Sequence, residues 1–219
     1  MANENSQPDR MWDEYDWERF FQAQDKKTER YLDLLDKYAD HPDRDALIAQ
    51  EMGWPQAWCE EGVEEGPEDE ASGYTEDGAQ ESERGGRSEE SPEQHPLYQQ
   101  MESLTLWLEH AWSARGALFD GEPVFDELTE QMSILSANIV ASLSGQEDGE
   151  LGMTIAFLKR SLRAANLALN AGDRVFRMGI FGRVRHKHLR GGLFAIRNEV
   201  VRMIGEQRMH WRRLQEDSR

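Results

Sequence analysis

Apolar side chains recur at steps of three and four residues along a stretch near the start of the chain, residues 12–39, which contains neither Gly nor Pro. This spacing predicts a helix with one apolar face and a coiled-coil-like period. Gln24 and Thr28 interrupt the middle of the face. Such an interruption either specifies register against a partner helix or marks a partly exposed seam. The face comprises Trp17, Phe21, Gln24, Thr28, Tyr31, Leu35 and Tyr38.

A second, shorter helix is expected after the sequence Asp40-His41-Pro42, because Pro fits the first turn of a helix, where its missing N–H costs nothing. Its apolar face is short, and Gly53 is a natural C-terminal stop. Trp54 and Trp58 follow. They either fold back on the helices or, if exposed, mark a docking surface. We therefore expect an N-terminal helical hairpin over residues 1–59.

Four segments with helical periodicity follow, at about 96–119, 123–143, 150–172 and 193–214, separated by Gly and Pro signals. No window shows sustained alternation of apolar and polar residues, so no strand is expected. Gly172 is a candidate stop for the third helix, and the connection over 173–192 is long enough for a short helix of its own. The sequence predicts an all-α fold in which residues 96–219 form an antiparallel four-helix bundle.

Charge divides the chain. The net charge of −18 arises from residues 1–95, whose balance is −19, whereas residues 159–219 have a balance of +10. Residues 60–95 contain 14 acids and 2 Arg, with almost no apolar side chains. Such a segment cannot bury enough apolar surface to offset its ordering entropy. We expect a disordered acidic linker between the hairpin and the bundle.

Several activities and locations are disfavoured. We find no phosphate-binding loop, no dinucleotide-binding glycine motif and no Gly-x-Ser-x-Gly nucleophile motif. No apolar run reaches the ~18 residues of a membrane-spanning helix, and no secretory signal is evident. Cys59 is the only cysteine, and the neighbouring Glu60 and Glu61 disfavour its thiolate. One cysteine excludes internal disulfides and fits a reducing cytoplasm.

The carboxylates do not form a recognisable metal site. The Glu-x-x-His pattern of ferritin-like bundles is missing. The nearest substitutes are Glu199, Glu206 and His210 on one flank of the last helix. Since Glu206 and His210 are four residues apart, a surface ion pair is the simpler interpretation. We expect no metal and no cofactor, and keep a metal-binding bundle enzyme as an alternative.

The connection over 173–192, DRVFRMGIFGRVRHKHLRGG, holds six Lys or Arg and one acid among apolar residues. This composition can bind phosphate backbones or anionic lipid surfaces, or it can form a loop that caps the bundle. The acidic linker is a candidate internal competitor. Arg115, central in an apolar stripe, either binds an anion, pairs with Glu127 or snorkels past the helix end. The anion-binding candidates are Arg174, Arg177, Arg183, Arg185, Lys187, Arg190 and Arg115.

The sequence favours a non-catalytic helical protein that serves as a protein–protein interaction or scaffolding module, with no catalytic residue. A protein partner or self-association is expected. Nucleic acid is disfavoured as a partner, because the acidic N-terminal part repels it. The alternative is a regulator that binds nucleic acid or another polyanion through residues 174–190. The partner-binding candidates are Trp17, Phe21, Tyr31, Leu35, Tyr38, Trp54 and Trp58.

Overall fold

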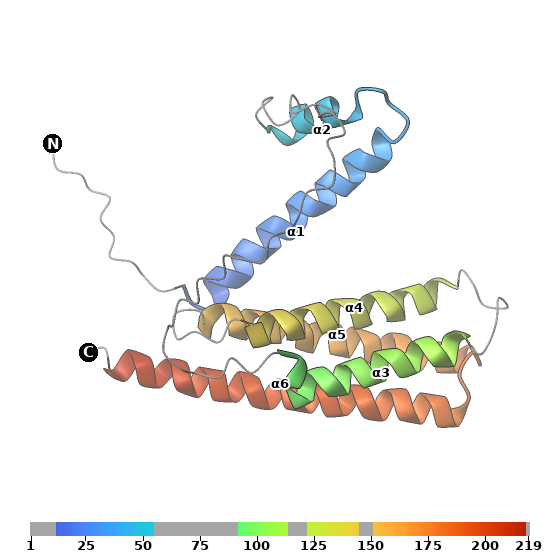
Figure 1. Cartoon of the computed structure of the whole chain (residues 1–219), viewed down its shortest axis with the longest axis vertical. Helices are drawn as coiled ribbons and strands as arrows, with labels where there is room; N and C mark the ends of the chain where they lie inside the picture. Colours follow the sequence, from blue (N-terminus) through green and yellow to red (C-terminus); the bar gives the residue numbers. More distant parts are fainter. Residues whose placement is uncertain (1–11, 55–91, 114–121, 145–150, 218–219) are drawn as a thin grey trace, which may run out of the picture. The chain divides into compact units, whose positions relative to one another are not determined.

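All the regular structure in the described residues is helical (Figure 1). The computed structural model describes residues 12–54, 92–113, 122–144 and 151–217, and these ranges contain no strand. The prediction of an all-α fold is confirmed. The elements are α1 (Glu14–Lys37), α2 (Arg44–Met52), the 3-10 turn η2 (Pro92–Gln94), α3 (Pro96–Ser113), α4 (Pro123–Ser144), α5 (Leu151–Arg177) and α6 (Arg183–Asp217).

The chain separates into two compact units. The first combines Met1–Arg19 with Glu89–Arg219, and the second is Phe20–Ser88. The first turns of α1 therefore belong to the larger unit. The domain boundaries expected after residues 59 and 95 stay predictions, and the expected acidic linker lies outside the described residues except for 92–95.

The core of the larger unit lies among α3, α4, α5 and α6, which we call the helical body. Helix α5 packs against α4 and α6, and α3 also packs against both. The apolar stripes predicted for these helices supply the buried side chains, as expected for amphipathic helices. The most completely buried include Leu97, Met101, Leu128, Met132, Leu135, Ile139, Leu158 and Leu193.

Helix α5 is buried on more than one face. Fourteen of its residues are buried, and many of these are Ala, Gly or Ser, such as Ala156, Ser161 and Ala168. Small side chains let neighbouring helices approach closely, so a helix of this composition can be surrounded without voids. The hydroxyls of Ser161 and Ser142 donate to carbonyl oxygens of their own helices, which satisfies these buried groups.

The expected stop at Gly172 and the long connection over 173–192 are wrong. Helix α5 continues to Arg177 and α6 begins at Arg183, so the connection is only residues 178–182. The glycines serve helix packing instead. A Cβ on Gly172 would lie 3.0 Å from Leu189 Cδ2, and one on Gly192 would lie 2.8 Å from Leu104 Cδ1. Both glycines lie inside helices, and at each a neighbouring leucine occupies the space that a larger side chain would need.

The beginning of α1 packs on the helical body within the larger unit. Asp13 caps the helix, since its Oδ1 accepts from the backbone N–H of Tyr15 at 2.8 Å and of Asp16 at 2.9 Å. Two ion pairs then join α1 to the body: Glu14 with Arg208 at 2.7 Å and Glu18 with Arg160 at 3.1 Å. The first turns of α1 are therefore held from both α5 and α6.

Candidate functional site

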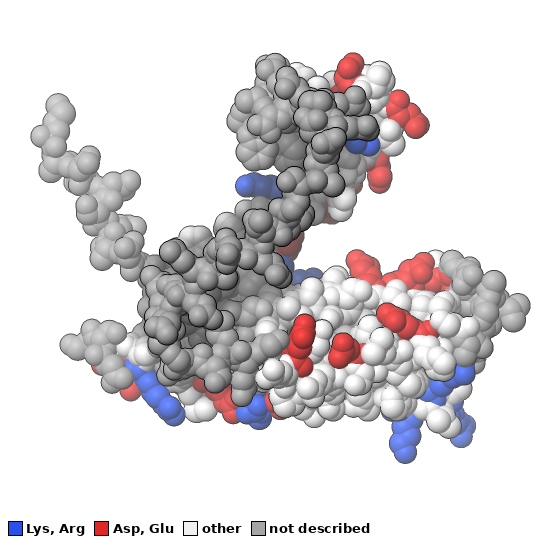
Figure 2. All heavy atoms as spheres, viewed as in Figure 1, with Lys and Arg blue, Asp and Glu red and all other residues white. Residues whose placement is uncertain are grey.

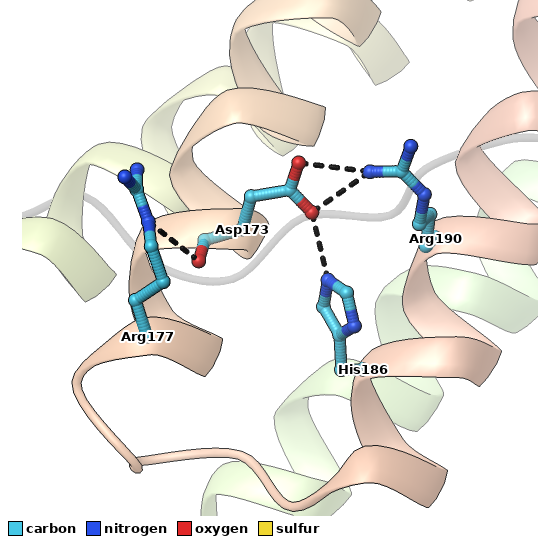
Figure 3. A network of polar contacts seen from close by, with 4 residues as sticks. All are labelled: Asp173, Arg177, His186 and Arg190. Atoms are coloured by element: carbon cyan, nitrogen blue, oxygen red, sulfur yellow. Dashed lines mark hydrogen bonds and ion pairs between the residues drawn. The ribbon is translucent and has the colours of Figure 1, made fainter.

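The end of the helical body where α5 meets α6 carries a network of polar contacts centred on Asp173 (Figure 3). His186 Nε2 lies 2.7 Å from Asp173 Oδ1, and Arg190 Nη1 donates to both carboxylate oxygens at 2.9 and 2.8 Å. The His186 ring also stacks on Phe176, with centroids 4.3 Å apart. This network joins the last turns of α5 to the first turns of α6.

The electrostatic surroundings of Asp173 favour its ionised form. Partial burial opposes ionisation, but the hydrogen bonds from His186 and Arg190 outweigh it and lower the pKa of the carboxyl group. Arg177 approaches the same residue differently, because its Nε donates to the backbone carbonyl of Asp173 at 3.4 Å. Asp173 thus neutralises Arg190 and leaves the charge of Arg177 without a carboxylate.

The turn between the helices explains how the sequence builds this end. Gly179 has a φ of +75°, which glycine adopts without strain. The N–H of Ile180 donates to the carbonyl of Val175 at 3.1 Å, so α5 ends in a Schellman-type cap. Ile180 and Phe181 are buried, and Phe181 meets Trp107 of α3. The apolar residues of the basic stretch therefore anchor the turn in the core.

The six predicted basic residues of this end fall into two groups. Arg174 forms an ion pair with Glu127 of α4, and Arg190 pairs with Asp173. In the described residues, Arg177, Arg183, Arg185 and Lys187 contact no carboxylate, and all but the half-buried Arg185 are exposed. We call these four residues the basic end. The seventh candidate, Arg115, lies outside the described residues.

Apolar side chains are also exposed beside the basic end. Met178 is 55% exposed and Val184 is 84% exposed. A shallow hollow of about 470 Å³ lies at the end of α5, lined by Asn170, Asp173, Arg174, Phe176 and Arg177. The Nε atom of Arg174 is buried and has no hydrogen-bond partner. This end therefore combines unpaired cations, exposed apolar groups and an unused donor.

Basic side chains gather at both ends of α6 on the face shown in Figure 2. Residues 183–213 contain nine Lys or Arg and two acids. Both acids, Glu199 and Glu206, bind Arg202 within the helix. Over the whole of α6, nine Lys or Arg stand against four acids, so this helix carries half of the +10 balance of residues 159–219.

The predicted partner-binding residues are divided between the two units. Trp17 lies in the larger unit, 5.0 Å from Trp12 between ring centroids. Phe21, Tyr31, Leu35, Tyr38 and Trp54 belong to the smaller unit, and Trp58 lies outside the described residues. The first four of these are half-buried, whereas Trp54 is exposed.

Glu51 of α2 forms the main polar contacts with α1 in the smaller unit. No sequence pattern pointed to this residue. Its carboxylate accepts from Lys37 at 2.7 Å and from the Tyr38 hydroxyl at 2.5 Å. Hydrogen bonds from Lys37 and then Tyr38 lower the pKa of Glu51. Arg30 donates to the Glu51 backbone carbonyl at 2.7 Å, and Tyr31 packs against Trp54 with centroids 5.6 Å apart. Three of the predicted aromatic residues, Tyr31, Tyr38 and Trp54, thus take part in the contacts of α1 with α2 and the residues that follow it.

The alternative of a metal-binding bundle gains no geometric support. Glu199 and Glu206 are bound to Arg202, and the hydrogen bonds from Arg202 lower the pKa of Glu199. Across the described ranges, no three His, Cys, Asp or Glu side chains are grouped so as to hold a metal ion. Among the helices of these ranges, none is long and apolar enough to cross a bilayer.

A scan against models of known protein families, a search of curated proteins and a search of solved structures each found no match to this chain.

Proposed function

We propose that this chain is a non-catalytic helical interaction protein that binds an acidic segment of a partner protein at the basic end of the helical body. The observation that carries the proposal is that Arg177, Arg183, Arg185 and Lys187 meet no carboxylate in the described residues, although acids outnumber bases in the whole chain. Surface cations gathered at one end raise the local concentration of an anionic partner.

Exposed apolar groups favour a protein over a nucleic acid as that partner. Met178 and Val184 lie exposed among the cations. Protein interfaces combine apolar contact with charged rims, whereas binding to a phosphate backbone draws mainly on Lys and Arg. An acidic protein segment with some apolar side chains is therefore the partner that fits this end best.

The architecture that we propose for this role is an antiparallel four-helix bundle of α3, α4, α5 and α6. The five-residue turn between α5 and α6 supports it, since short connections join antiparallel neighbours. We also propose that residues 60–91 act as a disordered acidic tether and that the protein works in the cytoplasm. The acidic composition and the single cysteine support these two statements.

Charge reversal at the basic end tests the proposal. The full-length protein is titrated into a fluorescently labelled, unstructured Glu-rich peptide, and anisotropy reports binding. We expect salt-sensitive binding that the triple variant Arg183→Glu, Arg185→Glu, Lys187→Glu weakens by roughly tenfold or more, because three favourable charge contacts become repulsive. The matched control reverses three exposed cations elsewhere, Lys26, Lys27 and Arg163. It should change the affinity less than threefold.

Two results would overturn this function. If the peptide fails to bind at low salt, or if the control variant weakens it as much as the test variant does, the basic end is not the binding site. If a short DNA duplex binds more tightly than the peptide and loses affinity in the same triple variant, the partner is a nucleic acid and not a protein.

A further inference from the structure

Helix α6 carries a second row of side chains at three- and four-residue spacing, on the face that points away from the core. Its inner row, which includes Leu193 and Val200, is fully buried. Every member of the outer row is exposed. Its apolar side chains are exposed to a large extent: Val201 is 46% exposed and Met209 is 51% exposed. The outer row comprises Val184, Lys187, Gly191, Phe194, Asn198, Val201, Gly205 and Met209.

Two glycines leave open space in this row. A Cβ atom placed on Gly191 or on Gly205 would meet no atom within 4 Å. Phe194 and Val201 lie between them along the helix. The helical backbone is therefore accessible at two points 14 residues apart, with larger apolar side chains between them. Knobs of a second helix fit positions of this kind when their own apolar residues repeat at steps of three and four.

Charge selects among the occupants of such a face. Nine Lys or Arg stand against four acids over α6, and two of these acids, Glu199 and Glu206, are already bound to Arg202. A second copy of the same face would bring like charges together, which is destabilising. Phosphate backbones gain nothing from a row of Val, Phe and Met side chains. Charge and apolar spacing together favour an acidic amphipathic helix.

We propose that the outer row of α6 binds an amphipathic helix of a partner protein, with apolar residues at heptad spacing and Asp or Glu on the flanks. This inference rests on the proposed function for the sign of the partner's charge, and adds its helical form and the surface on which it lies. Helix-in-groove recognition of this kind draws its affinity from apolar anchors and its orientation from the charged flanks.

The test uses the full-length protein and two labelled synthetic peptides of roughly four heptads each. The first has Leu at both core positions and Glu on the flanks. The second has the same composition with the Leu spacing scrambled. We expect the heptad peptide to bind at least tenfold more tightly than the scrambled one, and to gain helical circular dichroism on binding. Equal affinity for the two peptides would overturn the helical form of the partner.

Variants locate the surface. Phe194→Glu with Val201→Glu places acidic groups in the outer row and should weaken the heptad peptide at least tenfold. The matched control is Leu106→Glu with Leu167→Glu, two apolar side chains exposed on α3 and α5. It should change affinity less than threefold. If the control weakens binding as much as the test variant does, the outer row is not the site.

The variant Gly205→Gln tests the outer row without the risk that loss of binding comes from unfolding. The open space at Gly205 accepts the side chain without a clash, so the melting temperature should stay the same or rise. Heptad-peptide binding should nevertheless fall at least threefold, and unchanged binding would overturn close docking at this point.

The two proposals fail in different ways. In one outcome, the unstructured Glu-rich peptide binds while the heptad peptide binds no better than its scrambled form. That result would support the basic end as a binding site and overturn the proposal for the outer row. If no acidic peptide binds, both proposals are overturned. Tight binding of anionic lipid vesicles that the double variant abolishes, with no peptide binding, would reassign the outer row to a membrane surface.

Discussion

The two faces of α6 carry apolar side chains at the same spacing, yet only one of them is covered. Val200 on the inner face is fully buried and its neighbour Val201 is 46% exposed. Gly192 meets Leu104, whereas its neighbour Gly191 meets nothing. The periodicity of apolar residues thus indicates that a helix face can pack against another helix. Whether it does so depends on where the neighbouring helices lie. Adjacent residues of the same type, one covered and one exposed, allow this difference to be measured directly.

The largest expected difference is between Val200→Ala and Val201→Ala. Removing two buried methyl groups loses their transfer free energy and leaves a cavity, so Val200→Ala should lower the free energy of unfolding by about 1.5–3 kcal/mol. Val201→Ala should change it by less than about 0.5 kcal/mol. Urea unfolding followed by circular dichroism measures both. Equal losses would mean that the outer face is covered within the chain itself.

The glycine pair should give a smaller difference. Gly191→Ala places a methyl group in open space and should raise the free energy of unfolding by about 0.8–1 kcal/mol, through helix propensity alone. Gly192→Ala gains the same propensity but forces the buried Leu104 to shift. We therefore expect it to be less stable than Gly191→Ala by about 1–3 kcal/mol.

Thermal unfolding of both glycine variants measures that difference. Trp107 fluorescence is not specific enough for this purpose, since the chain has seven tryptophans, and circular dichroism at 222 nm is the better signal. If Gly192→Ala is as stable as Gly191→Ala, the core around Leu104 has room for a methyl group. Helices α6 and α3 then do not require a glycine at position 192.

These glycines also show what the sequence could not predict. The stripes of α3 and α4 are periodic over several turns, and their buried positions follow from that pattern. From the sequence alone, Gly172 looks like a helix stop and Gly192 like the end of a connection, because a glycine in a turn cannot be told from a helical glycine that admits a neighbouring leucine. That interpretation left the first turns of α6 out of the predicted helix, and with them part of the outer row.

The polar contacts of the candidate site were equally inaccessible. The basic composition of residues 174–190 was evident from the sequence. Which cations remain unpaired depends on tertiary contacts. Arg174 forms an ion pair with Glu127 of α4, and Arg190 forms one with Asp173 across the turn. Glu51 joins two helices in the same way. Spacing rules act within one helix, so contacts between helices fall outside their reach.

The smallest expected effect concerns Arg190, which lies where the two faces of α6 meet. Its guanidinium pairs with Asp173 toward α5 and lies 5.0 Å above the outer Phe194 ring. Hydrogen bonds from His186 and Arg190 lower the folded-state pKa of Asp173. A carboxyl group with a lowered pKa stabilises the fold above its unfolded pKa of about 3.9, and that stability is lost as pH falls through the folded value.

Asp173→Asn should therefore cost stability at pH 7 and little at pH 2–3. Because the Asp173 side chain is 39% exposed, solvent screens the pair and the loss at pH 7 should stay below about 1 kcal/mol. Urea unfolding of the wild type and the variant at both pH values measures it. An equal loss at both pH values would show that Asp173 acts through neutral hydrogen bonding and not through its charge, so that Arg190 is held on the border between the faces by packing alone.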